Sequence, residues 1–187
     1  MELELHIVEV ETERRWNWLE FFNANVEGTV YGRFLSYRDD ETFAWLQSPD
    51  TRLDLTHAPR RVKEVTRRLR PAYGSTITSI DELPRISASD LVEIRQYRLR
   101  SGTRERFAKF LHDRTLTEHK RLGMLVHGPF EVIDDADVLT WFRGFPDLAE
   151  RDRRKAAFYQ GRLWLDELED EAFSMIESYE VILAMPV

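Results

Sequence analysis

Three polar residues alternate with apolar ones along one stretch of the chain and could form a binding site. Glu93, Arg95 and Tyr97 would share one face of a strand, because successive side chains of a strand point to opposite faces. If Val92 and Ile94 face the helices, the polar face lines a cavity and could bind an anionic or carbonyl-bearing ligand. In any catalysis, Arg95 would stabilise developing negative charge and Glu93 would move a proton. Structural ion pairing is the simpler interpretation of the same residues.

An earlier strand offers one candidate proton acceptor. Its positions equivalent to those of the polar face are Glu4, His6 and Val8. Alternation therefore directs His6 toward the same cavity, where the imidazole could act as a general base near neutral pH. An isolated histidine on a strand is more often a hydrogen-bonded core or rim residue. We include His6 among the candidate ligand-binding residues and assign no catalytic residue.

The spacing of the histidines does not support a metal site. His112 and His119 are seven residues apart on a predicted helix, which separates them by about 10 Å along its axis. The chain has no cysteine, so thiolate ligands and thiolate nucleophiles are excluded. None of the glycines belongs to a phosphate-binding loop or a nucleophile elbow. We therefore expect neither a metal ion nor a cofactor.

The elements that position these residues follow a pattern that occurs twice. The earlier copy contains Gly32-Arg33-Phe34, Asp39, Trp45 and Pro49-Asp50, and the later copy contains Gly128-Pro129-Phe130, Asp135, Trp141 and Pro146-Asp147. Such self-similarity predicts a duplicated architecture of two related halves.

Hydrophobic periodicity and turn residues predict the elements of the first half. They are a strand at 3–10, a helix from Thr12 as N-cap to Asn25, strands at 28–37 and 42–47, a helix that starts at Pro59 and is stopped by Pro71, and a strand at 75–80. The segment 81–89 has the Pro and Ser content of a connector. We therefore expect one unit at 1–80 and a second at 90–187.

The second unit repeats the order of the first. We expect a strand at 91–99, a helix at 103–122, strands at 124–132 and 138–142, a helix at 147–159 and a strand at 179–185. The order β-α-β-β-α-β is that of a ferredoxin-like unit. The predicted fold class is α+β, with two tandem ferredoxin-like units whose antiparallel sheets form an α+β barrel with helices outside. Pairing between two chains would bury the sheets equally well, and the sequence does not choose between these arrangements.

Composition narrows the possible partners. The 187 residues carry a formal net charge of −7, which argues against nucleic acid, because phosphate binding requires a basic surface. No apolar run approaches the roughly 20 residues that a membrane-spanning helix needs. The lack of cysteine fits a reducing compartment. We expect a soluble, cytoplasmic protein that contacts neither nucleic acid nor membrane.

The second half resembles the NIPSNAP family, within the wider group of dimeric α+β barrels. The motifs that carry the resemblance are Glu93-x-Arg95-x-Tyr97, Gly102, Leu122-Gly123-Met124, the run from Trp141 to Arg151, Ala157-Phe158-Tyr159 with Trp164, and Ser174 to Ser178. They cover the chain from about residue 90 to its end in matching order. The first half matches only through the internal repeat.

The resemblance implies a ferredoxin-like barrel protein of unsettled activity, associated with vesicle or mitochondrial biology in animals. It repeats Arg143, Arg151, Phe158, Tyr159 and Trp164 most fully, so these residues could line the mouth of the cavity, and Trp141 could fill the interior or form part of its wall. A local structural role is the competing interpretation, since aromatic residues at helical spacing usually belong to the core.

We predict that the protein binds a small organic ligand in an apolar barrel cavity and forms a homo-oligomer. Two alternatives stay open. One is a non-enzymatic oligomeric interaction module with a solid barrel interior. The other is a cofactor-independent, monooxygenase-like enzyme, which the wider barrel group suggests by fold analogy alone.

Overall fold

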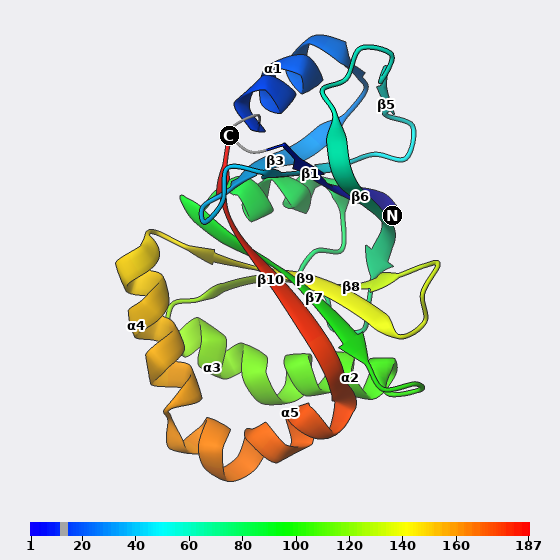
Figure 1. Cartoon of the computed structure of the whole chain (residues 1–187). Helices are drawn as coiled ribbons and strands as arrows, with labels where there is room; N and C mark the ends of the chain where they lie inside the picture. Colours follow the sequence, from blue (N-terminus) through cyan, green and yellow to red (C-terminus); the bar gives the residue numbers. More distant parts are fainter. Residues whose placement is uncertain (12–14) are drawn as a thin grey trace.

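The computed structural model describes residues 1–11 and 15–187 and contains a closed barrel of antiparallel strands (Figure 1). The predicted N-cap Thr12 lies outside the described residues. The barrel strands are β1 (Leu3–Val10), β3 (Val30–Ser36), β4 (Thr42–Gln47), β6 (Arg61–Pro71), β7 (Leu91–Leu99), β8 (Leu125–Val132), β9 (Val138–Phe145) and β10 (Ile176–Pro186). Two short strands, β2 (Val26–Glu27) and β5 (Arg52–Leu53), pair separately.

Each half contributes four barrel strands in the same spatial order. The first half runs β6-β1-β4-β3 and the second runs β10-β7-β9-β8, which is the ferredoxin-like order in both cases. Pairing of β3 with β10 and of β6 with β8 closes the barrel. The predicted α+β barrel with antiparallel strands and outer helices is therefore confirmed, and both sheets come from one chain.

The helices lie outside the barrel, on opposite sides of the molecule (Figure 1). Helix α1 (Arg15–Asn25) covers strands of the first half. The second half carries α2 (Arg104–Phe110), the π-helical segment η2 (Leu111–Thr115), α3 (Leu116–Arg121), α4 (Leu148–Tyr159), a second π-helical segment η3 (Trp164–Leu168) and α5 (Glu169–Met175). We did not predict η3 and α5 from the sequence. None of the described helices is long and apolar enough to cross a membrane.

The predicted helix after Pro59 is wrong, because this segment forms strand β6. Val65 and Leu69 are four residues apart, a spacing that keeps side chains on one face in a helix and in a strand alike. Both pack with the barrel core, whereas Val62, which a helix would place on the same face as Val65, is 67% exposed. Strand β6 pairs with β1 along most of its length and provides the fourth strand of the first half.

The predicted strand at 75–80 is also wrong, since β6 already occupies the fourth position. Ile77 enters the barrel core from an irregular segment, and the chain continues into a 3₁₀ helix, η1 (Ile80–Ser87). Leu83 and Ile86 of this helix are buried against the same core. The expected connector therefore packs against one end of the barrel.

Apolar side chains from all eight strands fill much of the barrel interior. Leu5, Phe34, Ile94 and Phe142 belong to one buried cluster, together with the two core residues of η1. Val92 and Ile94 thus face the interior, and the intervening residues of β7 face the helices. This is the reverse of the orientation in which the polar face of β7 would line the barrel.

Candidate functional site

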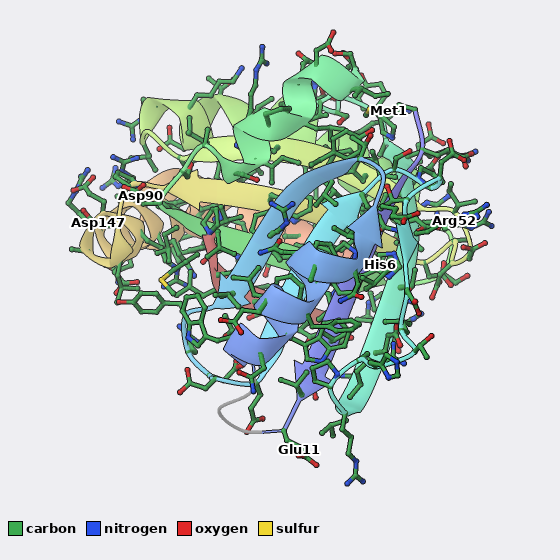
Figure 2. All side chains as sticks on the ribbon, turned by 90° about the horizontal axis from the view of Figure 1, so that it is seen from above. Met1, His6, Glu11, Arg52, Asp90 and Asp147 are labelled. Atoms are coloured by element: carbon green, nitrogen blue, oxygen red, sulfur yellow. The ribbon has the colours of Figure 1, made fainter. Side chains whose placement is uncertain are left out.

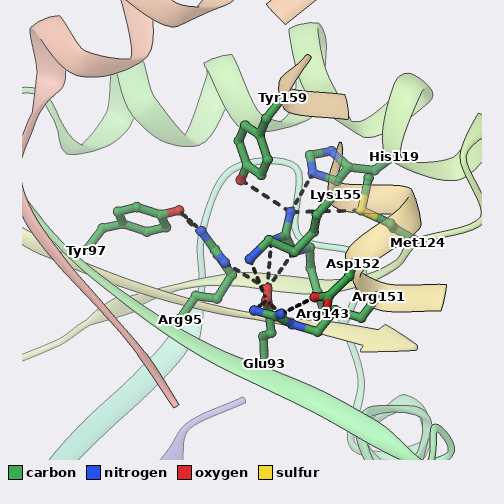
Figure 3. Close-up of polar contacts among 10 residues, drawn as sticks. All are labelled: Glu93, Arg95, Tyr97, His119, Met124, Arg143, Arg151, Asp152, Lys155 and Tyr159. Atoms are coloured by element: carbon green, nitrogen blue, oxygen red, sulfur yellow. Dashed lines mark hydrogen bonds and ion pairs between the residues drawn. The ribbon is translucent and has the colours of Figure 1, made fainter. Parts of the chain in front are cut away.

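One buried carboxylate, that of Glu93, is surrounded by four cationic side chains (Figure 3). Arg95 Nη1 lies 2.7 Å and Arg143 Nη2 lies 2.6 Å from Glu93 Oε2. Arg151 Nη2 lies 2.7 Å and Lys155 Nζ lies 3.0 Å from the other oxygen, Oε1. The Glu93 side chain has no solvent exposure. We call these five residues the Glu93 cluster.

Two strands and one helix bring the cluster together. The antiparallel register of β7 and β9 places Glu93 opposite Arg143. Helix α4 supplies Arg151 and Lys155, which are one helical turn apart and therefore share a face. The α4 N-terminus is fixed by Asp147, whose side chain accepts a hydrogen bond from the backbone N–H of Glu150 at 2.7 Å.

Aromatic side chains enclose the guanidinium groups. Arg95 lies 5.0 Å from the centroid of the Trp141 ring, and Arg143 lies 5.5 Å from it. The Nε of Arg95 donates to the Tyr97 hydroxyl at 3.2 Å, and Nη1 of Arg143 donates to the Tyr159 hydroxyl at 3.3 Å. These contacts satisfy part of the donor capacity of the two arginines in a site that water barely reaches.

A neutral histidine closes the inner side of the cluster. His119 Nδ1 lies 2.8 Å from the backbone carbonyl of Thr115, which can only accept, so Nδ1 carries the proton. The unprotonated Nε2 faces Arg143 Nη1 at 3.5 Å, and Met124 Sδ lies 3.9 Å from the same nitrogen. Burial, followed by repulsion from Arg143, lowers the pKa of His119 to about 3.

The pKa values of the neighbouring groups reflect the surplus of positive charge. Burial by itself would raise the pKa of Glu93, but attraction by Arg143, Arg95 and the other cations holds it well below its usual range. Burial lowers the pKa of Lys155, and the nearby arginines oppose the attraction of Glu93. For Tyr159, attraction by Arg143 and Arg95 outweighs burial and lowers the pKa of the phenol.

The charges around the cluster do not balance. Arg151 Nη1 also pairs with Asp152 at 2.6 Å, and Glu169 lies at the rim of the adjoining cavity. Counting Asp152 and Glu169 with Glu93, one positive charge of the four cations is left over. A buried excess charge is costly unless a counter-ion approaches it.

A cavity of about 330 Å³ adjoins this excess charge on the outer side of the barrel. Its lining comes from β7, β10, α4, η3 and α5, and consists of Arg95, Tyr97, Lys155, Tyr159, Trp164, Glu169, Phe173, Ile176, Tyr179 and Val181. Arg95, Lys155 and the two phenols supply polar contacts, and the remaining wall is mainly apolar. This combination can hold the acidic group and the apolar body of one small molecule.

The structure brings together most of the residues selected from the sequence. Glu93, Arg95, Tyr97, Trp141, Arg143 and Arg151 are neighbours on the outer side of the second half. The sequence analysis missed Lys155 and His119 as members of the site. The four-residue spacing of Arg151, Lys155 and Tyr159 on the predicted helix was a usable signal for Lys155.

His6 does not join the Glu93 cluster. It lies on β1 beside α1 (Figure 2), where its ring stacks on Trp45 at a centroid distance of 4.6 Å. Its Nε2 is 3.1 Å from Glu4 Oε2, and its Nδ1 is 3.0 Å from the Thr66 hydroxyl. The described part of the chain contains no group of three or more His, Asp or Glu side chains arranged to hold a metal ion.

The sequence profile of the NIPSNAP family matches residues 92–187, which is more than half of the chain and includes the whole Glu93 cluster. The chain belongs to the NIPSNAP family. The resemblance drawn from the second half is thereby confirmed. No curated protein matches this NIPSNAP chain.

Several solved structures are similar to this chain. A "putative monooxygenase" from Lactobacillus acidophilus is 10% identical, covers 99% of this chain and 93% of its own, and has a TM-score of 0.64. A second "putative monooxygenase", from Fusobacterium nucleatum, has the same identity and TM-score over 99% of this chain and 91% of its own. An uncharacterized NIPSNAP domain protein from Burkholderia xenovorans is 18% identical over 52% of this chain and 94% of its own, with a TM-score of 0.48. For the two monooxygenase-titled structures, at 10% identity, the likeness concerns the fold alone.

Proposed function

We propose that this NIPSNAP protein binds a small organic monoanion with an apolar body in the cavity beside the Glu93 cluster. The observation that carries the proposal is the uncompensated positive charge of the cluster, which adjoins a cavity of about 330 Å³. One negative charge would balance the surplus. The site differs from the barrel cavity expected from the sequence, since it lies between the sheet and the helices.

The two ends of the cavity favour the two parts of such a ligand. Arg95 and Lys155 can donate to a carboxylate from one side, and Tyr159 can donate a further hydrogen bond. Trp164, Phe173 and the other apolar lining residues would cover the body of the ligand. In a largely dry site each charge-assisted hydrogen bond is stronger than in water.

A ligand can bind without breaking most of the existing ion pairs. Glu93 keeps contacts with Arg95, Arg143 and Arg151 if Lys155 turns toward a ligand. Lys155 can reorient more easily than the three arginines. Its ammonium group sits on a flexible side chain and rotates freely, whereas a guanidinium group is planar and rigid. We therefore assign Lys155 as the main contact to the acidic group.

The proposal also includes the expected domain division, cellular location and oligomeric state. A division into units at 1–80 and 90–187, a cytoplasmic location and assembly into a homo-oligomer fit the composition and the exposed apolar side chains of Leu165 and Phe173 on the outer helices. The interaction-module alternative would use this exposed surface without needing an occupied cavity. Titration with small anions distinguishes the interaction module from a ligand-binding protein.

Isothermal titration calorimetry with benzoate and with benzamide tests the proposal, because the two probes share a ring and differ in charge. We expect benzoate to bind at least about tenfold more tightly than benzamide, and Lys155→Met to remove this preference. Lys109→Met is the matched control, since Lys109 is exposed on α2 and pairs with Glu105 at 2.9 Å. Equal affinities for the two probes, or an unchanged preference in Lys155→Met, would overturn the proposal.

A further inference from the structure

A second cavity, of about 550 Å³, opens at the end of the barrel opposite η1. The helix η1 approaches the barrel near Gly32, and Ser89, just after it, lies against Gly144, so both are close to the same end of β3 and β9. The second cavity begins instead near Ser36, at the other end of β3. Its lining residues come from β1, β3, β4, β6, β7 and β10 and from the turn between β3 and β4. It is separate from the cavity beside the Glu93 cluster, which lies outside the barrel.

An unpaired cation reaches into this cavity from β6. Arg67 lies opposite Leu5 of β1, a residue of the barrel core, so its side chain projects into the barrel. Its Nε is buried without a hydrogen-bond partner, and no described residue forms an ion pair with its guanidinium. The arginine on the outer face of the same strand, Arg70, pairs with Glu131. Asp135 attracts Arg67 without forming an ion pair with it. The Arg67 guanidinium therefore keeps donor groups that can bind an anionic group.

An unpaired anion reaches into the cavity from the opposite wall. Strands β6 and β10 are four positions apart in the eight-stranded order, so they face each other across the barrel. Glu180 of β10 lies opposite Gln96 in the register with β7 and is two residues from Ile182, which packs against the barrel core. Glu180 attracts Lys63 across the cavity. Neither Glu180 nor Gln96 makes a side-chain hydrogen bond or ion pair with any residue that the structure describes.

Apolar and internally neutralised groups occupy the space between these opposite charges. Ile7, Val65 and Ile182 line the middle of the cavity. The neighbouring Lys63 already pairs with Glu9, at 2.9 Å, so this pair adds no net charge. Arg38, Asp39 and Glu41, which are exposed on the turn between β3 and β4, also line the opening of the cavity. Inside the barrel, the cavity presents the guanidinium of Arg67, an apolar middle and the carboxylate of Glu180.

We propose that the open end of the barrel is a second binding site, for a dipolar molecule with an anionic and a cationic group joined by a short apolar spacer. Arg67 binds the anionic group and Glu180 binds the cationic group, while Gln96 donates or accepts a hydrogen bond beside them. Acidic side chains line this cavity as well as basic ones, so it has no surplus of positive charge. Its ligands therefore differ from those of the Glu93 cluster, where a surplus of positive charge favours a simple monoanion.

The test uses 6-aminohexanoate, hexanoate and hexylammonium, three probes of similar length that differ in charge. Binding is followed by NMR through the side-chain amide of Gln96 in the full-length protein. We expect 6-aminohexanoate to bind at least about tenfold more tightly than either singly charged probe. Arg67→Met and Glu180→Gln should each remove this preference, and Arg67→Lys should keep most of it.

Arg70→Met is the matched control, because Arg70 lies on the same strand and faces outward. Absence of any Gln96 shift at 6-aminohexanoate concentrations up to about 10 mM would overturn the proposal. So would equal binding of the three probes, or retention of the preference in Arg67→Met. Lys155→Met should leave this titration unchanged, so the outcome here is independent of the anion site beside the Glu93 cluster.

Discussion

Glu4 and Glu93 occupy equivalent places on the first strands of the two halves, yet only one of them is surrounded by cations. The register places Gln47 opposite Glu4 and places Arg143 opposite Glu93. Gln47 Nε2 donates to Glu4 at 2.9 Å, and His6 lies 3.1 Å from the same oxygen. A partly exposed carboxylate is thus satisfied by neutral donors and water.

The difference follows from the helices that cover the strands. In the second half, α4 contributes Arg151 and Lys155 and removes Glu93 from solvent. The first half has strand β6 where a second helix was expected, and Glu4 retains 20% side-chain exposure. A carboxylate that remains in contact with water does not require a buried counter-ion, whereas Glu93 would be unstable without one.

The largest expected effect comes from neutralising the two carboxylates in turn. Glu93→Gln leaves four cations without their shared anion in a buried site, and should lower the free energy of unfolding by about 3–5 kcal/mol. Glu4→Gln should cost about 1 kcal/mol or less. Denaturant unfolding of both variants measures the two values. Similar losses would mean that the two environments do not differ in the way that their contacts indicate.

Acid should destabilise the protein partly through His119. An unfolded histidine titrates near pH 6.5, and the pKa of His119 in the folded protein is about 3. The unfolded state therefore binds more protons between these values, so stability is fully present above about pH 6.5 and falls as the pH decreases toward 3. One such proton changes the free energy of unfolding by about 1.4 kcal/mol per pH unit.

His119→Gln should reduce this slope by about that amount between about pH 4 and 6. The measurement is a series of denaturant unfolding curves across that range. His6→Gln is the comparison from the first half, where burial also lowers the histidine pKa but attraction by Glu4 opposes it. An unaltered slope in His119→Gln would show that His119 is not held neutral in the folded state.

The sequence predicted which residues alternate but not which face meets the helices. Val92 and Ile94 could pack equally well in the barrel core or against α2 to α5, because both environments are apolar. The grouping of Glu93, Arg95 and Tyr97 was therefore predictable, and their position outside the barrel was not. The sequence alone does not place Arg143 beside them, because that position depends on the register of β7 and β9.

Strand β6 shows a second limit of the sequence pattern. The four-residue spacing of Val65 and Leu69 fits both kinds of element, and only the pairing of β6 with β1 and β8 decides between them. The free pair Arg67 and Glu180 depends on the closed order of the barrel, since the two residues are far apart in the chain and lie on strands that do not pair. Such long-range relations require the tertiary structure.

The central claim, a surplus of positive charge beside Glu93, can be measured most directly on two lysines that each contact a carboxylate. Lys63 lies 2.9 Å from Glu9, and this pairing raises its pKa. Lys155 lies 3.0 Å from Glu93 but shares it with three arginines, and burial with their repulsion lowers its pKa. Titration of the lysine ¹³Cε resonances by NMR, with and without benzoate, follows both groups.

We predict that Lys155 titrates below 10.5, the usual value for lysine, and that benzoate raises its pKa while leaving that of Lys63 unchanged. A Lys155 pKa at or above the usual value, unaffected by benzoate, would contradict the account.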